Sequence, residues 1–132
     1  MTWRGLATTA CVALGACGLP LLAQERTLVG YYRCEGQQGG QPYVVPLQVL
    51  AFGQTYRLEW GQPAHLFGLG VLSDGRLAVA IVAPSTGAIG VALYQVTAGR
   101  LSGIWSRGDS RVDVETCVVP AGREAQQAPR DD

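Results

Sequence analysis

The sequence predicts an all-β fold, an eight-stranded antiparallel up-and-down barrel, with a small two-layer β-sandwich as the alternative. Three observations support this prediction. After residue 24, segment after segment alternates hydrophobic and polar residues with a period of two, and no segment shows a sustained helical period. Glycine-containing turn sequences separate these segments at even intervals. Short, evenly spaced strands with no helix to cover a sheet face favour a sheet that closes on itself.

The alternation defines eight expected strands. The clearest is TYRLEW, in which Tyr56, Leu58 and Trp60 share one face and polar residues share the other. In RLAVAIV and GAIGVALYQV, large aliphatic residues alternate with small residues, which is typical of the wall of a small barrel. The expected strands cover residues 27–36, 42–52, 55–61, 65–72, 76–83, 88–97, 100–106 and 111–119.

The turns form two series that predict two unequal ends of the barrel. Gly53, Gly75 and Gly99 lie in short turn sequences, where glycine supplies the positive backbone angles that two-residue hairpins need. The sequences SDGRL and TAGRL are two such hairpins. Because alternate turns of a meander lie at the same end, the other turns are expected at the opposite end. Those turns are longer and richer in Gly, Pro, Ser and Gln: GQQGGQP, WGQPAH, APSTGA and SRGDSR.

The N-terminal segment is predicted to be a signal peptide. Arg4 precedes the apolar run LATTACVALGACGLPLLA, and Ala23 is a small residue at a suitable cleavage point. The alternative is a lipoprotein signal, because LGAC resembles a lipobox in which Cys17 would be acylated. Both predict export to the periplasm or the extracellular space, with membrane contact only through a lipid anchor. The expected organisation is a signal peptide at 1–23, one barrel domain at 24–119 and a disordered tail at 120–132.

Two cysteines remain after the leader, and in an exported chain we expect Cys34 and Cys117 to form a disulfide. They lie on the first and last expected strands, which are neighbours only if the sheet closes or nearly closes. The alternation places Cys117 on the face of Asp113 and Glu115, which we expect to form a solvated charged strip. It places Cys34 on the face of Tyr32. A β-bulge, or a bond at the end of the barrel, would reconcile the two faces.

The loose end of the barrel is expected to carry the function, because loops vary while the scaffold holds them in place. Barrel mouths are also common ligand sites. Aromatic residues gather at the strand ends there, and Trp and Tyr combine an apolar body with a polar tip that suits a half-wet rim. The alternative is that these rings only seal the core. The candidate binding residues are Trp60, Trp105, Tyr43, Phe67, His65 and Arg107.

The sequence offers little support for catalysis, metals or nucleic acid. Ser85, His65 and Asp109 can be assembled into a triad on paper, but no GxSxG motif supports it, so we expect no enzyme and no catalytic residues. His65 is the single histidine and two cysteines are assigned to a disulfide, so we expect no metal site and no cofactor. The formal net charge of +0 provides no basic footprint for nucleic acid.

Several segments resemble a group of small exported bacterial β-barrel proteins, mostly uncharacterised and sometimes labelled fibronectin-binding-like. The matching segments are GYYRCEG, GQTYRLEW, GLGVLSDGRLAVAI, GVALYQV and GRLSGIWSRG. The resemblance covers most of the mature chain and implies a strand layout similar to that of lipocalin and avidin barrels. The lipocalin GxW opening is replaced by GYY, so ligand binding does not follow from it.

The expected function is therefore a non-enzymatic exported binding module that contacts a protein or an envelope polymer through its loose-end loops. The alternative is a carrier that holds a small apolar ligand in the barrel mouth, beneath Trp60 and Trp105. A barrel whose interior is completely filled by side chains would exclude the carrier. The sequence names neither the partner nor the ligand.

Overall fold

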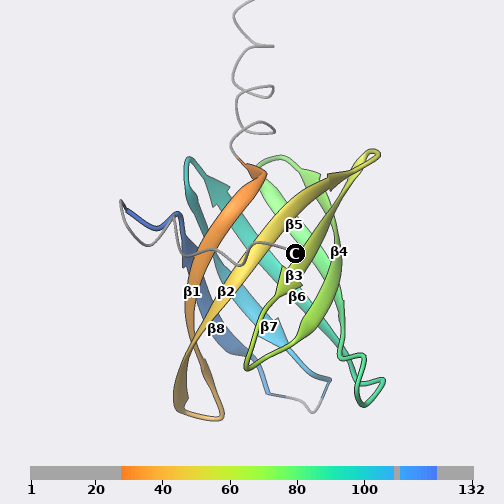
Figure 1. Cartoon of the computed structure of the whole chain (residues 1–132), viewed down its shortest axis with the longest axis vertical. Coiled ribbons are helices and arrows are strands. Elements are labelled where there is room, and N and C mark those ends of the chain that lie inside the picture. Colours follow the sequence, from red (N-terminus) through yellow and green to blue (C-terminus); the bar gives the residue numbers. More distant parts are fainter. Residues whose placement is uncertain (1–27, 109–110, 122–132) are drawn as a thin grey trace, which may run out of the picture.

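The computed structural model describes residues 28–108 and 111–121, which form a closed antiparallel barrel (Figure 1). Each strand pairs with its neighbours in the sequence, and the last strand pairs with the first. The predicted barrel is confirmed and the β-sandwich alternative is wrong. Within this part of the chain, no helix has the length and hydropathy of a membrane span. The strands are β1 (Gly30–Gln38), β2 (Gln41–Phe52), β3 (Thr55–Trp60), β4 (Leu66–Ser73), β5 (Arg76–Val82), β6 (Ile89–Thr97), β7 (Arg100–Ser106) and β8 (Asp113–Val118).

Three of the predictions concern residues that lie outside this described part. The expected signal peptide at 1–23 and the lipid anchor on Cys17 precede it, and most of the expected tail at 120–132 follows it. They stay predictions.

The alternating residues of the strands build the core as expected on most strands. On β5, Leu77, Val79 and Ile81 are buried while the alanines between them face outward. Strand β4 is an exception, because Gly68 and Gly70 face the interior while Leu69 and Val71 face outward. Strand β6 is another, because Gly90, Ala92, Tyr94 and Val96 face the interior while Val91 and Leu93 face outward. The end of the barrel with the tight turns is filled by fully buried aliphatic side chains, whose removal from water is the main source of stability. They include Leu28, Val49, Leu77 and Leu101.

The turns confirm that one end of the barrel is tight, and they correct the prediction at the other end. Two residues connect β2 to β3, β4 to β5 and β6 to β7, with Gly53, Gly75 and Gly99 at positive φ. The β1–β2 connection was expected to be longer, but it is also a two-residue turn. Gly39 and Gly40 have φ of 60° and 82°, so both strands stay paired up to the tip. Longer loops join the other three strand pairs at that end (Figure 1).

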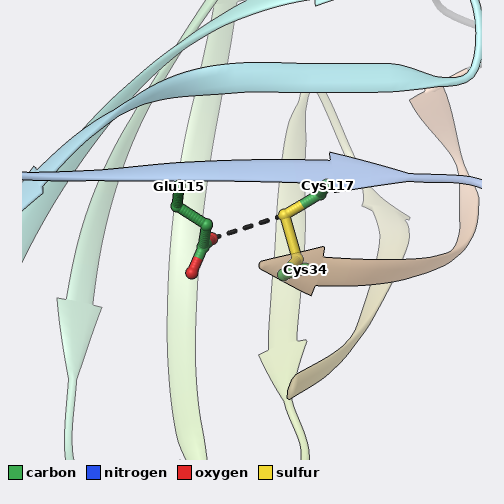
Figure 2. A group of neighbouring side chains, drawn as sticks. All are labelled: Cys34, Glu115 and Cys117. Atoms are coloured by element: carbon green, nitrogen blue, oxygen red, sulfur yellow. Dashed lines mark hydrogen bonds between the residues drawn. A yellow bond between two sulfur atoms is a disulfide. The ribbon is translucent and has the colours of Figure 1, made fainter. Parts of the chain in front are cut away.

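The predicted disulfide between Cys34 and Cys117 is present. The two residues are direct partners in the β1–β8 ladder, their Cα atoms are 3.9 Å apart, and both side chains are fully buried. The ladder is continuous around the pair, so the expected bulge is wrong. The bulge was expected because Glu115 was assigned to an exposed charged strip. In the structure, Glu115 shares the inward face with Cys117 and is itself buried (Figure 2).

The disulfide joins residues 83 positions apart, so its removal should cost substantial stability. A loop of this length favours the folded state by roughly 4–5 kcal/mol in the chain-entropy model, and measured losses fall at about 2–5 kcal/mol. We expect the Cys34→Ala/Cys117→Ala double variant to lose about 2–5 kcal/mol in urea unfolding followed by circular dichroism. Thr116→Ala, on the same strand, is the control. Equal unfolding midpoints for the double variant and the wild type would refute a structural role for the bond.

Candidate binding site in the barrel mouth

A cavity of about 320 Å³ opens at the end of the barrel opposite the three short glycine turns. Its walls are mostly apolar and aromatic, and a single carboxylate lies among them. Side chains therefore do not fill the barrel interior at this end. An unfilled interior is what the carrier alternative requires. The lining residues are Gln38, Tyr43, Val45, Trp60, Pro63, Ala64, Leu66, Ile81, Tyr94, Trp105, Arg107 and Glu115.

Glu115 is the acceptor of a hydrogen-bond network inside the barrel. Its side chain projects from β8 into the interior, and the residue is only 5% exposed. Oε2 accepts a hydrogen bond from the Tyr43 hydroxyl at 2.6 Å. Oε1 accepts one from the Tyr94 hydroxyl at 2.7 Å and one from Trp60 Nε1 at 3.3 Å. Three donors directed at one carboxyl group match the ionised form, which only accepts hydrogen bonds. They offset the cost of burying it.

The strand register explains how two tyrosines reach Glu115. Gly36 on β1 and Gly103 on β7 are its direct partners on the two neighbouring strands. Tyr43 is the next partner beyond Gly36, and Tyr94 is the next beyond Gly103. A Cβ atom on Gly36 would lie 2.5 Å from the Tyr43 hydroxyl, and one on Gly103 would overlap a backbone carbonyl of β6. Gly36 therefore leaves the space that the Tyr43 hydroxyl occupies, and Gly103 allows the close approach of the β6 backbone that carries Tyr94.

The disulfide forms one side of this network. Cys117 Sγ lies 3.4 Å from Glu115 Oε1 (Figure 2). A disulfide sulfur carries no proton, so this is a close polar contact and not a donated hydrogen bond. Within residues 28–108 and 111–121, Cys34, Glu115 and Cys117 are the one grouping with metal-ligand geometry. Cysteine binds metals as the thiolate. The oxidised pair therefore cannot supply thiolate ligands.

Burial raises the pKa of both tyrosines that hold Glu115. For Tyr43, burial is the largest cause, the hydrogen bond to Glu115 and its charge add to it, and the Trp105 side chain acts in the opposite direction. For Tyr94, burial again comes first, followed by the charge of Glu115 and the hydrogen bond to it. Both hydroxyl groups therefore stay protonated, as hydrogen-bond donors, throughout the neutral pH range.

Trp105 packs against Tyr43 in the cavity wall. Its ring meets that of Tyr43 edge to face, with the centroids 6.2 Å apart. Its Nε1 atom is buried and has no hydrogen-bond partner of acceptable geometry among the residues described. The polar neighbour of this N–H is the Tyr43 hydroxyl, whose pKa the Trp105 side chain lowers.

The structure divides the six predicted binding residues into two groups. Tyr43, Trp60, Trp105 and Arg107 line the cavity. Phe67 and His65 do not line it. Their rings pack against each other with centroids 5.9 Å apart, beside a shallow depression on the outer surface.

Phe67 lies outside because Gly68 takes the inward position on β4 beside Val79 and Trp60, so the residue before it faces outward. The hypothetical catalytic triad of Ser85, His65 and Asp109 is not assembled by the described residues. Ser85 is exposed in the β5–β6 loop, and Asp109 lies outside the described residues.

Sequence reasoning missed Glu115 and Tyr94. A signal for Glu115 was present: a disulfide between the first and last strands of a barrel places both cysteines inside, and Glu115 is two residues from Cys117 on the same face. For Tyr94, the large aliphatic residues that alternate with it obscured the inward face of its strand.

Comparison of the chain with models of protein families, with curated proteins and with solved structures yields no match. The resemblance to small exported bacterial barrels stays a prediction. Any function must therefore be argued from the geometry of the mouth.

Gly36 allows a direct test of the network. Gly36→Ala adds a methyl group 2.5 Å from the Tyr43 hydroxyl and 2.6 Å from the Val114 carbonyl oxygen. Overpacking of this kind typically costs about 1–3 kcal/mol, and we expect a loss in this range in urea unfolding. Gln37→Ala, at the exposed neighbouring position, should change little. An unchanged midpoint for Gly36→Ala would show that the close packing around Tyr43 is not required.

The raised pKa values of Tyr43 and Tyr94 predict alkaline destabilisation. Above pH 10, the ordinary tyrosine value, the unfolded chain loses these two protons while the folded barrel keeps them. Stability should therefore be intact below pH 9 and fall above pH 10, by up to about 1.4 kcal/mol per pH unit for each tyrosine. Urea midpoints measured from pH 8 to 12 should fall less steeply for the Tyr43→Phe/Tyr94→Phe variant. Equal slopes for this variant, the wild type and a Tyr31→Phe control would contradict the assignment.

Proposed function

We propose that this protein binds a small, largely apolar molecule in the mouth of its barrel, with a hydrogen-bond donor of the ligand directed at Glu115. The observation that carries the proposal is a buried carboxylate in the lining of an open, aromatic cavity. Ligand sites commonly combine mostly apolar walls with a few placed polar groups. The proposal favours the carrier, the alternative in the sequence analysis, over the partner-binding module.

The cavity suggests the chemistry of its ligand. A volume of about 320 Å³ lies at the small end of ligand pockets, so the molecule is small. The rings of Tyr43, Trp60, Tyr94 and Trp105 favour an apolar or aromatic body. Glu115 accepts three hydrogen bonds, and an ionised carboxylate offers about four acceptor sites, which leaves a site for one further donor. An ammonium group would bind there more strongly than a hydroxyl, because its hydrogen bond is charge-assisted at both ends.

The cellular setting is part of the proposal. A buried disulfide indicates an oxidising environment. Together with the expected signal peptide, it supports action in the periplasm or outside the cell, as a soluble protein or through a lipid anchor on Cys17. A macromolecular partner at the loose-end loops stays a prediction, because exposed loops do not by themselves favour one. We assign no reaction to the site.

Tryptophan fluorescence tests this proposal, because Trp60 and Trp105 lie in the cavity wall. Titration with hexylamine, benzylamine and the matching alcohols should give saturable changes, with each amine binding more tightly than its alcohol. Glu115→Gln should weaken amine binding by at least about tenfold, or 1.4 kcal/mol, and reduce alcohol binding less. His65→Ala, outside the cavity, is the control, and circular dichroism checks the fold of each variant.

Two results would refute the proposal. One is the absence of a saturable change with any of the four compounds. The other is a folded Glu115→Gln variant that binds amines as tightly as the wild type.

A further inference from the structure

The outside of the barrel has one strongly apolar side. Of the large aliphatic residues on β4 to β8 that point outward, eight are between 42% and 71% exposed. We refer to them together as the outer apolar face. They are Leu69, Val71, Val82, Ile89, Val91, Leu93, Ile104 and Val114.

The strand register shows that this face is continuous. One row runs across all five strands through direct partners: Val71, Ala78, Leu93, Ile104 and Val114. Neighbouring rows on the same strands pair Leu69 with Ala80 and Val91, and Val82 with Ile89. Direct cross-strand partners on one sheet face have side chains in contact range. The eight residues therefore form one patch.

The rest of the outer surface is different in character. On β1, Arg33 and Glu35 form an exposed ion pair. On β3, Arg57 and Glu59 form another, with Nε and Oε1 2.8 Å apart. Charged pairs thus lie on the outer surface of β1 and β3, whereas the outer surface of β4 to β8 carries the continuous apolar patch. Exposed hydrophobic residues also occur on β1 and β2, namely Tyr31, Val44 and Phe52. Large exposed apolar patches usually mark a site of interaction, so this concentration of apolar residues indicates a partner.

The size of the face matches a protein interface. Eight roughly half-exposed aliphatic residues present on the order of 700 Å² of surface. The largest apolar patch of a typical monomer covers about 300–600 Å², and each partner in a standard interface contributes about 800 Å². A patch of this extent marks a surface that is covered by a partner.

The relief of the face fits a second copy of the same chain. Ala78 and Ala80 on β5 are smaller than their direct partners on β4 and β6, which are leucines and valines. Under a two-fold axis, Val91 and Leu93 of one copy can therefore lie over the alanines of the other. Each copy then contributes the same apolar residues, as an isologous interface requires. No complementary charge from a different partner is needed.

We propose that this protein is a homodimer in which the outer apolar faces of two barrels pack against each other. The face lies on the side of the barrel that β4 to β8 form, and the cavity opens at the end of the barrel opposite the three short glycine turns. Of the residues that line the cavity, none belongs to the outer apolar face. The dimer leaves both mouths open, and the inference does not depend on the proposed ligand.

Sedimentation velocity of the purified protein at 1–50 µM (roughly the range of a specific interface) tests this inference. The wild type should sediment as a dimer. Val91→Lys, in the centre of the face, should shift the protein to the monomer. Val44→Lys is the matched control, because Val44 is 49% exposed on β2 and lies outside the face. Circular dichroism and urea unfolding check that each variant folds.

Three results would overturn the inference. The first is a wild type that remains monomeric up to 50 µM. The second is a dimer that Val91→Lys and Val44→Lys weaken equally. The third is a monomer that floats with vesicles of phosphatidylethanolamine and phosphatidylglycerol and loses this binding in Val91→Lys, which would show that lipid covers the face. If Val91→Lys fails to fold, Leu93→Gln replaces it and the same criteria apply.

Discussion

The structure depends on one interior constraint, the burial of the Glu115 carboxylate. A charge removed from water requires several hydrogen bonds in a protein interior. Two tyrosines and a tryptophan from three different strands supply them. Of the glycines beside Glu115, the one on β1 leaves room for the Tyr43 hydroxyl and the one on β7 allows the close approach of the β6 backbone, and the disulfide closes one side of the site. This requirement fixes the arrangement of β1, β2, β3, β6, β7 and β8 around the mouth.

The same constraint explains why the two ends of the barrel differ. At the tight end, aliphatic side chains pack against one another and need no polar partners. At the other end, Tyr43, Trp60 and Tyr94 must keep their polar atoms near Glu115, so they line a cavity instead of filling it. With Tyr94 facing inward on β6, the aliphatic residues that alternate with it must face outward. The inner network and the outer apolar face are thus coupled through the alternation of a single strand.

Local signals made most of the fold predictable. Period-two alternation located the strands to within a few residues, and glycine in short turns located the tight hairpins. The candidate site was only partly predictable, because charge suggested that Glu115 faces water while its position relative to Cys117 indicated the interior. The inward face of Gly90, Ala92 and Tyr94 could not be chosen from residue size, since the aliphatic residues between them are larger. That choice depends on contacts across strands, which the sequence does not display.

The measurement that tests this account most directly is NMR observation of the hydroxyl protons of Tyr43 and Tyr94 in water. Hydroxyl protons of exposed tyrosines exchange too fast to be seen, whereas those held by a buried carboxylate should give separate downfield signals. The account predicts two such signals, each with a nuclear Overhauser effect to the Glu115 side chain, and the loss of both in Glu115→Ala. Fast exchange of both protons in the folded wild type would show that Glu115 does not organise the mouth.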